Sequence, residues 1–142
     1  MDYKTKYKML LQIRDISTYY ESIKDDISKS YKLSSIQATI LIDIYNNGNM
    51  VKITDICKRL HKKTNSISPL IDRLIIDGYI IKEKSEKDKR ITYVSLTKKA
   101  IDVTNNVLQD LFDYILPLYD KFSEQELLDI SKHLDKITSI II

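Results

Sequence analysis

The chain has 142 residues, of which 43% are hydrophobic and 30% are charged, a composition typical of one folded globular domain. Two glycines and one cysteine argue against a phosphate-cradling loop, an internal disulfide framework and a thiolate zinc site made by one chain. The first residues are charged and no long apolar run follows, so the sequence argues against a signal peptide and a membrane span. Since the common catalytic motifs are also missing, we expect a cytoplasmic protein that is not an enzyme and holds no metal or cofactor.

Charge is distributed unevenly along the chain. Residues 50–100 contain thirteen Lys and Arg against six Asp and Glu, a net charge of +7. The whole chain carries +3, so the remaining segments together carry −4. A basic middle between acidic ends is typical of a protein that binds a polyanion, although a solvated charged face would also explain an excess of lysine.

The first predicted element is a long helix over residues 3–31, which also needs a partner. Its apolar residues recur every three or four positions for about eight turns, which is the helical period. A helix cannot bury such a stripe against itself, so the partner lies elsewhere in the chain or in a second chain. The stripe comprises Tyr3, Tyr7, Leu10, Ile13, Ile16, Tyr20, Ile23, Ile27 and Tyr31.

Short helices follow, and two of them form a familiar pair. Ser34 and Gln37 make a capping box that opens a helix ending near Gly48, where glycine can adopt the left-handed conformation. A helix over residues 53–60 is then separated by a three-residue polar turn from a helix over residues 64–77. Two short helices joined in this way are typical of a helix-turn-helix.

The pattern then changes from helical spacing to alternation. Residues 79–84 and 91–96 are rich in β-branched and aromatic side chains and predict two strands. The residues between them, 85–90, are polar and mostly basic. A helix-turn-helix followed by a hairpin with a basic tip predicts a winged helix.

Two further helices complete the chain. Thr97 is the expected N-cap of a helix that runs to about Leu116, where Pro117 is expected to break it. Ser123 and Glu126 form a second capping box, which opens a last helix reaching about Ile140 and an apolar tail, 140–142. The predicted fold class is therefore mainly α with a small β-hairpin wing.

Two motifs lie within residues 72–97. Asp72, Arg73 and Leu74 are followed by Gly78, and Asp88, Arg90, Leu96 and Thr97 form D-x-R-x₅-L-T. These motifs resemble the multiple antibiotic resistance regulator (MarR) family of winged-helix transcription regulators, and residues 55–60 are similar to a helix of that family. The resemblance implies a homodimer in which segments 1–32 and 98–142 form the dimerisation helices and residues 33–97 form the DNA-binding lobe. It also implies repression from a near-palindromic operator, often relieved by a small phenolic ligand or an oxidant.

The resemblance also assigns DNA contacts. Four residues at the start of the recognition helix match base-facing positions of the family: Thr64, Asn65, Ser66 and Ser68. Asn can pair with adenine, and Ser or Thr can bond base edges or phosphates. Lys62 and Lys63 are expected to reach phosphates. At the wing tip, where the family inserts an arginine into the minor groove, Asp88 is expected to brace Arg90, although an ion pair that merely shapes the turn remains an alternative. The predicted DNA-binding residues are Lys62, Lys63, Thr64, Asn65, Ser66, Ser68, Arg73, Lys87, Lys89 and Arg90.

The sequence departs from the family pattern at several positions. Lys63 stands where the family commonly has an aspartate cap, so Thr64 is the expected cap instead. Pro69 stands where many members carry an arginine, and Ser68-Pro69 could itself open the helix. The peroxide-sensing branch of the family has a similar Thr-Pro pair, which favours an earlier start. Ala100 replaces the usual glycine.

Cys57 raises the question of redox sensing. The peroxide-sensing branch places its reactive cysteine in the first helix, which has none here, and Cys57 aligns with a small buried residue. Basic neighbours would favour the reactive thiolate if the side chain were exposed. A free cysteine is often simply a small buried hydrophobe, so we expect a structural role.

The sequence therefore favours a DNA-binding regulator over an enzyme and over a protein-binding adaptor. Its expected partners are double-stranded DNA, a second copy of the chain and a small-molecule effector, with no membrane. A winged-helix adaptor that binds proteins without DNA is the alternative, and the basic wing and polar recognition helix argue against it.

Overall fold

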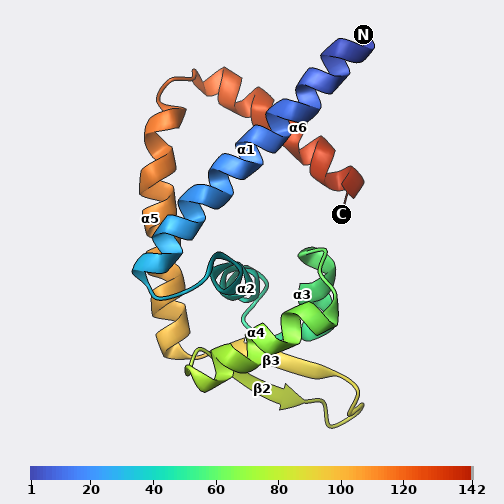
Figure 1. The fold of residues 1–142 in the computed structure, drawn as a ribbon, viewed down its shortest axis with the longest axis vertical. Helices are drawn as coiled ribbons and strands as arrows, with labels where there is room; N and C mark the ends of the chain where they lie inside the picture. Colours follow the sequence, from blue (N-terminus) through green and yellow to red (C-terminus); the bar gives the residue numbers. More distant parts are fainter. Residues whose placement is uncertain (142) are drawn as a thin grey trace.

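The computed structural model describes residues 1–141, which form six helices and three strands. Figure 1 shows a winged-helix lobe at one end and long helices from both chain termini at the other. The elements are α1 (Tyr3–Ser30), α2 (Ser35–Asn46), β1 (Val51–Lys52), α3 (Ile53–Arg59), α4 (Thr64–Ile76), β2 (Ile80–Lys84), β3 (Thr92–Leu96), α5 (Lys98–Tyr119) and α6 (Glu124–Ile141).

The main apolar core lies in the lobe, where α2, α3 and α4 pack against one face of the sheet. Each element contributes the side chains that its apolar spacing predicts, and Ile40, Ile56, Ile71 and Val94 are at most 1% exposed. A smaller cluster of Ile23, Val107 and Leu111 joins α1 to α5. The predicted winged-helix fold is confirmed.

The sheet has the order β1-β3-β2, with both pairings antiparallel. The two long strands form the predicted hairpin, in register from Ile80 opposite Leu96 to Lys84 opposite Thr92. β2 lies at an edge, and its residues after Ile80 are exposed. The sequence did not predict β1, which pairs Val51 with Val94, because two residues are too few to show alternation.

The predicted helix starts are confirmed where a side chain caps the helix. Ser34 accepts a hydrogen bond from the Gln37 N–H at 3.2 Å, while the Gln37 side chain accepts one from the Ser34 N–H at 2.9 Å. The Ser123 and Glu126 pair repeats this arrangement at the start of α6. Thr97 caps α5 by accepting from the Ala100 N–H.

The predicted break at Pro117 is wrong, because α5 continues through it to Tyr119. Proline lacks an N–H and therefore deprives the Asp113 carbonyl of its helical partner. This loss falls in the last turn of the helix, on residues that are exposed, so water can satisfy the carbonyl and the helix runs on.

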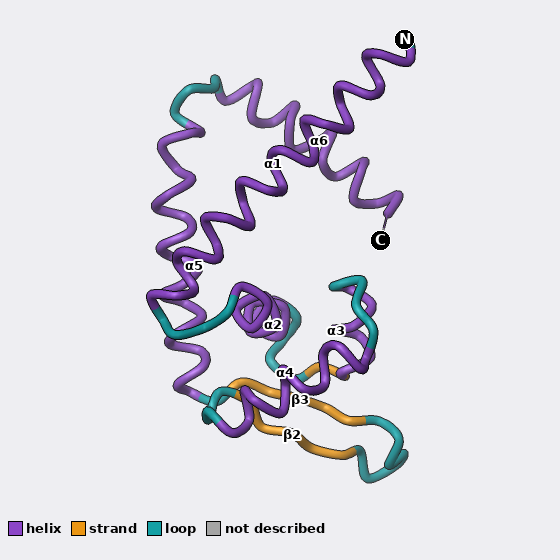
Figure 2. Tube along the Cα trace, in the orientation of Figure 1, coloured by secondary structure: helices purple, strands orange, loops and turns teal. Residues whose placement is uncertain are grey.

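The helices from the two termini leave a large apolar surface uncovered. α1 and α6 project from the lobe and α5 connects the two regions (Figure 2). In α1 the exposed apolar side chains include Leu10 and Ile16, and no described residue of α6 is buried. Ile142 of the predicted apolar tail lies outside the described residues. None of the helices in residues 1–141 combines the length and apolar character needed to span a bilayer.

Candidate nucleic-acid interface

The start of α4 has no side-chain cap. Its N-cap is Lys63, whose side chain makes no capping hydrogen bond, and Thr64 is the first helical residue. The predicted Thr64 cap is therefore wrong, as is the alternative start at Ser68-Pro69, since Pro69 lies inside the helix. Instead the Lys63 carbonyl accepts from the N–H groups of Ser66 and Ile67. The first turn thus leaves backbone N–H groups available to an anion.

The predicted base-facing residues gather on this first turn. Thr64, Asn65 and Ser66 are exposed, whereas Ser68 is half-buried beside the core residue Ile67. Ile67, Ile71 and Leu74 bury the opposite face of α4 in the lobe, which holds the polar face outward. The arrangement presents short hydrogen-bonding side chains at an open helix end.

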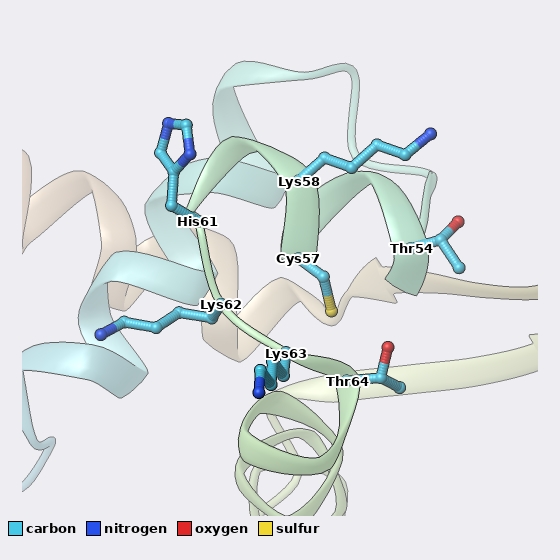
Figure 3. A pocket seen from close by; sticks show the side chains of 7 residues that line it. All are labelled: Thr54, Cys57, Lys58, His61, Lys62, Lys63 and Thr64. Atoms are coloured by element: carbon cyan, nitrogen blue, oxygen red, sulfur yellow. The ribbon is translucent and has the colours of Figure 1, made fainter.

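An open groove of about 720 Å³ separates α3 from the start of α4 (Figure 3). The sequence predicted Lys62, Lys63 and Thr64 as parts of this site and missed Thr54 and Lys58. Their spacing of one helical turn along α3 was the available signal. The side chains that line the groove are Thr54, Cys57, Lys58, His61, Lys62, Lys63 and Thr64.

The wing tip is held by an ion pair. Arg90 donates from Nε and Nη2 to the two carboxylate oxygens of Asp88, each at 3.0 Å, and its backbone N–H donates to the same carboxylate. The guanidinium lowers the pKa of Asp88 below its usual value, so the brace is intact at neutral pH and is lost only when acid protonates the carboxylate. This geometry agrees with the predicted bracing and with the alternative that the pair only shapes the turn.

The predicted DNA-binding cations fall into two groups. Arg73 and Arg90 are paired, with Asp77 at 3.2 Å and Asp88 at 3.0 Å. The other group comprises Lys62, Lys63, Lys87 and Lys89. Within residues 1–141, no carboxylate lies within ion-pair distance of their ammonium nitrogens. These lysines flank the open end of α4 and the wing tip and carry uncompensated positive charge.

Two charged contacts that join α1 and α3 to α2 were not predicted from the sequence. Lys24 is 4% exposed and donates to Glu21 at 2.8 Å and to Thr39 at 2.6 Å, which ties α1 to α2. Arg59 makes a two-point ion pair with Asp43 at 2.8 and 2.7 Å, which ties α3 to α2. The signal for Lys24 was a charge beside Ile23 within the apolar stripe of the first helix.

Cys57 is 7% exposed and belongs to the core of the lobe, as predicted. Its sulfur points toward the gap between α3 and the start of α4, whereas Lys58 and His61 point away from the sulfur (Figure 3). The thiol therefore lies at the floor of the groove rather than in the centre of the core. A structural role remains a prediction.

Comparison with known proteins places this arrangement in a class. The family model for transcriptional regulator SarA/Rot matches residues 22–107. The HTH-type transcriptional regulator MhqR of Bacillus subtilis is 25% identical over 114 residues, which cover 78% of each protein. A MarR protein from Peptoclostridium difficile superposes with a TM-score of 0.83 and 25% identity, covering 94% of this chain and 86% of the other. A mutant E. coli MarR in complex with operator DNA shares the fold, with a TM-score of 0.78 and 16% identity over 96% and 99% of the chains.

The fold and the matches together define a winged-helix transcriptional regulator, which is not an enzyme. The chain belongs to the SarA/Rot family of transcriptional regulators, and the predicted MarR-type resemblance is confirmed.

Proposed function

We propose that the protein binds a near-palindromic DNA operator as a homodimer and acts as a repressor. The observation that carries this proposal is the joint position of the uncapped first turn of α4 and four lysines that have no ion-pair partner within residues 1–141: Lys62, Lys63, Lys87 and Lys89. The lysines would neutralise phosphates, and the polar turn would contact base edges in the major groove. A dimer seated on an operator that overlaps a promoter would block transcription.

A selection experiment separates the two proposed roles. Duplexes recovered from a random-sequence pool by the wild-type protein serve as probes. Replacing both Lys87 and Lys89 with alanine should weaken binding to all of them and reduce the slope of log affinity against log salt by about four. Each phosphate contact contributes about one, and the dimer contains each lysine twice. Asn65→Ala should instead change the recovered sequence, because amide contacts discriminate between bases by about 1–3 kcal/mol.

Lys132→Ala is the control for these substitutions, since this lysine lies on α6, outside the lobe. It should leave both the slope and the recovered sequence unchanged. Wing variants that alter the recovered sequence would reverse the assigned roles. A wild-type protein that recovers no duplex even at low salt would favour the adaptor function.

We further propose that a small anionic molecule relieves DNA binding. A cavity of about 700 Å³ lies between α1, α2 and the end of α3. Its lining includes three cations, Lys24, Arg59 and Lys62, against one carboxylate, Glu21, which is paired with Lys24. Lys62 also lines the groove at the start of α4. An anion in the cavity would attract Lys62 and withdraw it from DNA, which links occupancy of the cavity to release.

Benzoate and its uncharged analogue benzamide test this link. We expect benzoate to raise the melting temperature of the protein and to weaken DNA binding, and benzamide to do neither, because the cavity supplies positive charge. Fluorescence anisotropy on the recovered duplex measures release. Equal effects of the two compounds, or none from benzoate, would contradict an anionic effector at this cavity.

A further inference from the structure

The turn that ends α4 is closed without help from other elements. The Gly78 N–H donates to the Ile75 carbonyl at 3.0 Å, and the Tyr79 N–H donates to the Leu74 carbonyl at 2.8 Å. Gly78 has a φ of +79°, the left-handed conformation that this Schellman arrangement requires. These two bonds satisfy the Leu74 and Ile75 carbonyls and require no contact from another element.

Three consecutive carbonyls of this turn are nevertheless taken by the start of α5. Lys99 Nζ donates to the Asp77 carbonyl at 2.7 Å, and Thr97 Oγ1 donates to the Gly78 carbonyl at 2.8 Å. The Thr97 N–H donates to the Tyr79 carbonyl at 3.0 Å, which continues the ladder of β2 and β3 by one residue pair. The Lys99 ammonium also lies 4.2 Å from the centre of the Tyr79 ring, a cation–π distance.

The geometry points to a positioning role for Lys99, which we propose locks the recognition helix α4 to α5. α5 runs from this turn into the region of the terminal helices (Figure 1). In the dimer proposed above, on which this inference rests, the lock would fix the separation and angle of the two α4 helices. Lys99 would thereby determine which half-site spacing the protein accepts.

The length of α4 makes this position sensitive. The helix has 13 residues and is about 20 Å long, and the lock is at the opposite end from the base-facing turn. A rotation of about 10° at the lock would therefore move that turn by about 3.5 Å, close to the rise of one base pair. Control of the angle at Lys99 amounts to control of the register on DNA.

Lys99→Met and Lys98→Met form a matched pair of variants. Both lysines are exposed and lie side by side in the first turn of α5, and within residues 1–141 Lys98 makes no side-chain hydrogen bond or ion pair. Both variants lose one charge and keep an unbranched side chain, but only Lys99→Met loses the contacts to Asp77 and Tyr79. Lys99→Arg should restore function, because a guanidinium donates hydrogen bonds and stacks on aromatic rings.

The first measurement does not involve DNA. Nitroxide labels at Ser66→Cys on α4 and Asn105→Cys on α5, in a Cys57→Ala background and diluted with unlabelled protein, report the distance between the two helices. Lys99→Met should broaden this distance distribution, and Lys98→Met and Lys99→Arg should leave it as in the parent. An unchanged distribution in Lys99→Met would overturn the lock.

The second measurement uses recovered duplexes in which the spacing between half-sites is changed by one base pair. The preference of the wild-type protein for its best spacing should fall by about three- to tenfold in Lys99→Met, the size of one ordinary hydrogen bond, because Lys99 is exposed. Single half-site affinity should be unchanged. A general loss of stability would weaken binding at every spacing equally, and that outcome would overturn the role in spacing. If the wild-type protein recovers no DNA, the proposed function fails, and the label distances still decide the lock.

Discussion

Replacing Leu134 and Ile137 with aspartate is expected to convert the protein into a monomer with little affinity for DNA. Both side chains lie on the apolar stripe of α6 and are 54% and 44% exposed in the single chain. The exposed stripes of α1 and α6 are larger than the scattered apolar residues of a monomer surface, and interfaces of obligate homodimers bury about 2,000–5,000 Å². Burying a carboxylate in such an interface costs several kcal/mol, which prevents association.

The loss of DNA affinity should exceed about a hundredfold, because a dimer binds its second half-site intramolecularly. Light scattering measures the oligomeric state, and fluorescence anisotropy measures affinity. Lys132→Asp, on the polar side of the same helix, should remain dimeric, which controls for added charge. Deletion of residues 135–142 should likewise release or precipitate monomers. A folded wild-type monomer at micromolar concentration would contradict the dimer.

Asp43→Ala is expected to lower the free energy of unfolding by about 2–3 kcal/mol and the melting temperature by roughly 5–10 °C. The Asp43 side chain is 8% exposed and accepts two hydrogen bonds from Arg59, whose own side chain is 31% exposed. Removing the carboxylate leaves a partly buried guanidinium without its partner. Denaturant unfolding at fixed protein concentration measures the change.

Two variants make the test of Asp43 specific. Asp102→Ala removes an exposed carboxylate from α5 and should change stability by less than about 0.5 kcal/mol. A double variant with Asp43→Leu and Arg59→Met should have a higher free energy of unfolding than Asp43→Ala, because it leaves no buried charge unpaired. If Asp43→Ala and Asp102→Ala had the same melting temperature, the ion pair would not stabilise the contact between α2 and α3.

The sequence predicted the elements whose residues repeat with a clear period or carry a cap. The long stripe from Tyr3, the Ser34 and Gln37 box and the hairpin residues all act locally, so their structure could be inferred without tertiary contacts. Pro117 misled the prediction because the effect of proline depends on its distance from the helix end. β1 was missed because its pairing with β3 is a tertiary contact made by two residues.

The candidate site divides along the same line. The polar first turn of α4 and the basic wing tip each consist of consecutive residues, so each could be recognised from the sequence. The Arg59 and Asp43 pair joins residues 16 positions apart, and Lys99 meets the Asp77 carbonyl across 22 positions. The packing of separate elements determines such contacts, and spacing along the chain contains no record of them.

The position of β2 at the sheet edge has a consequence for solubility. An edge strand offers unpaired backbone groups to any other extended chain, and a row of such strands is a route to aggregation. Here Lys82, Glu83 and Lys84 are exposed along that edge, and a second strand docking there would have to desolvate these charges. The wing is thereby protected from strand-by-strand growth, and the proposed dimer would form instead through the apolar helices at the other end of the molecule.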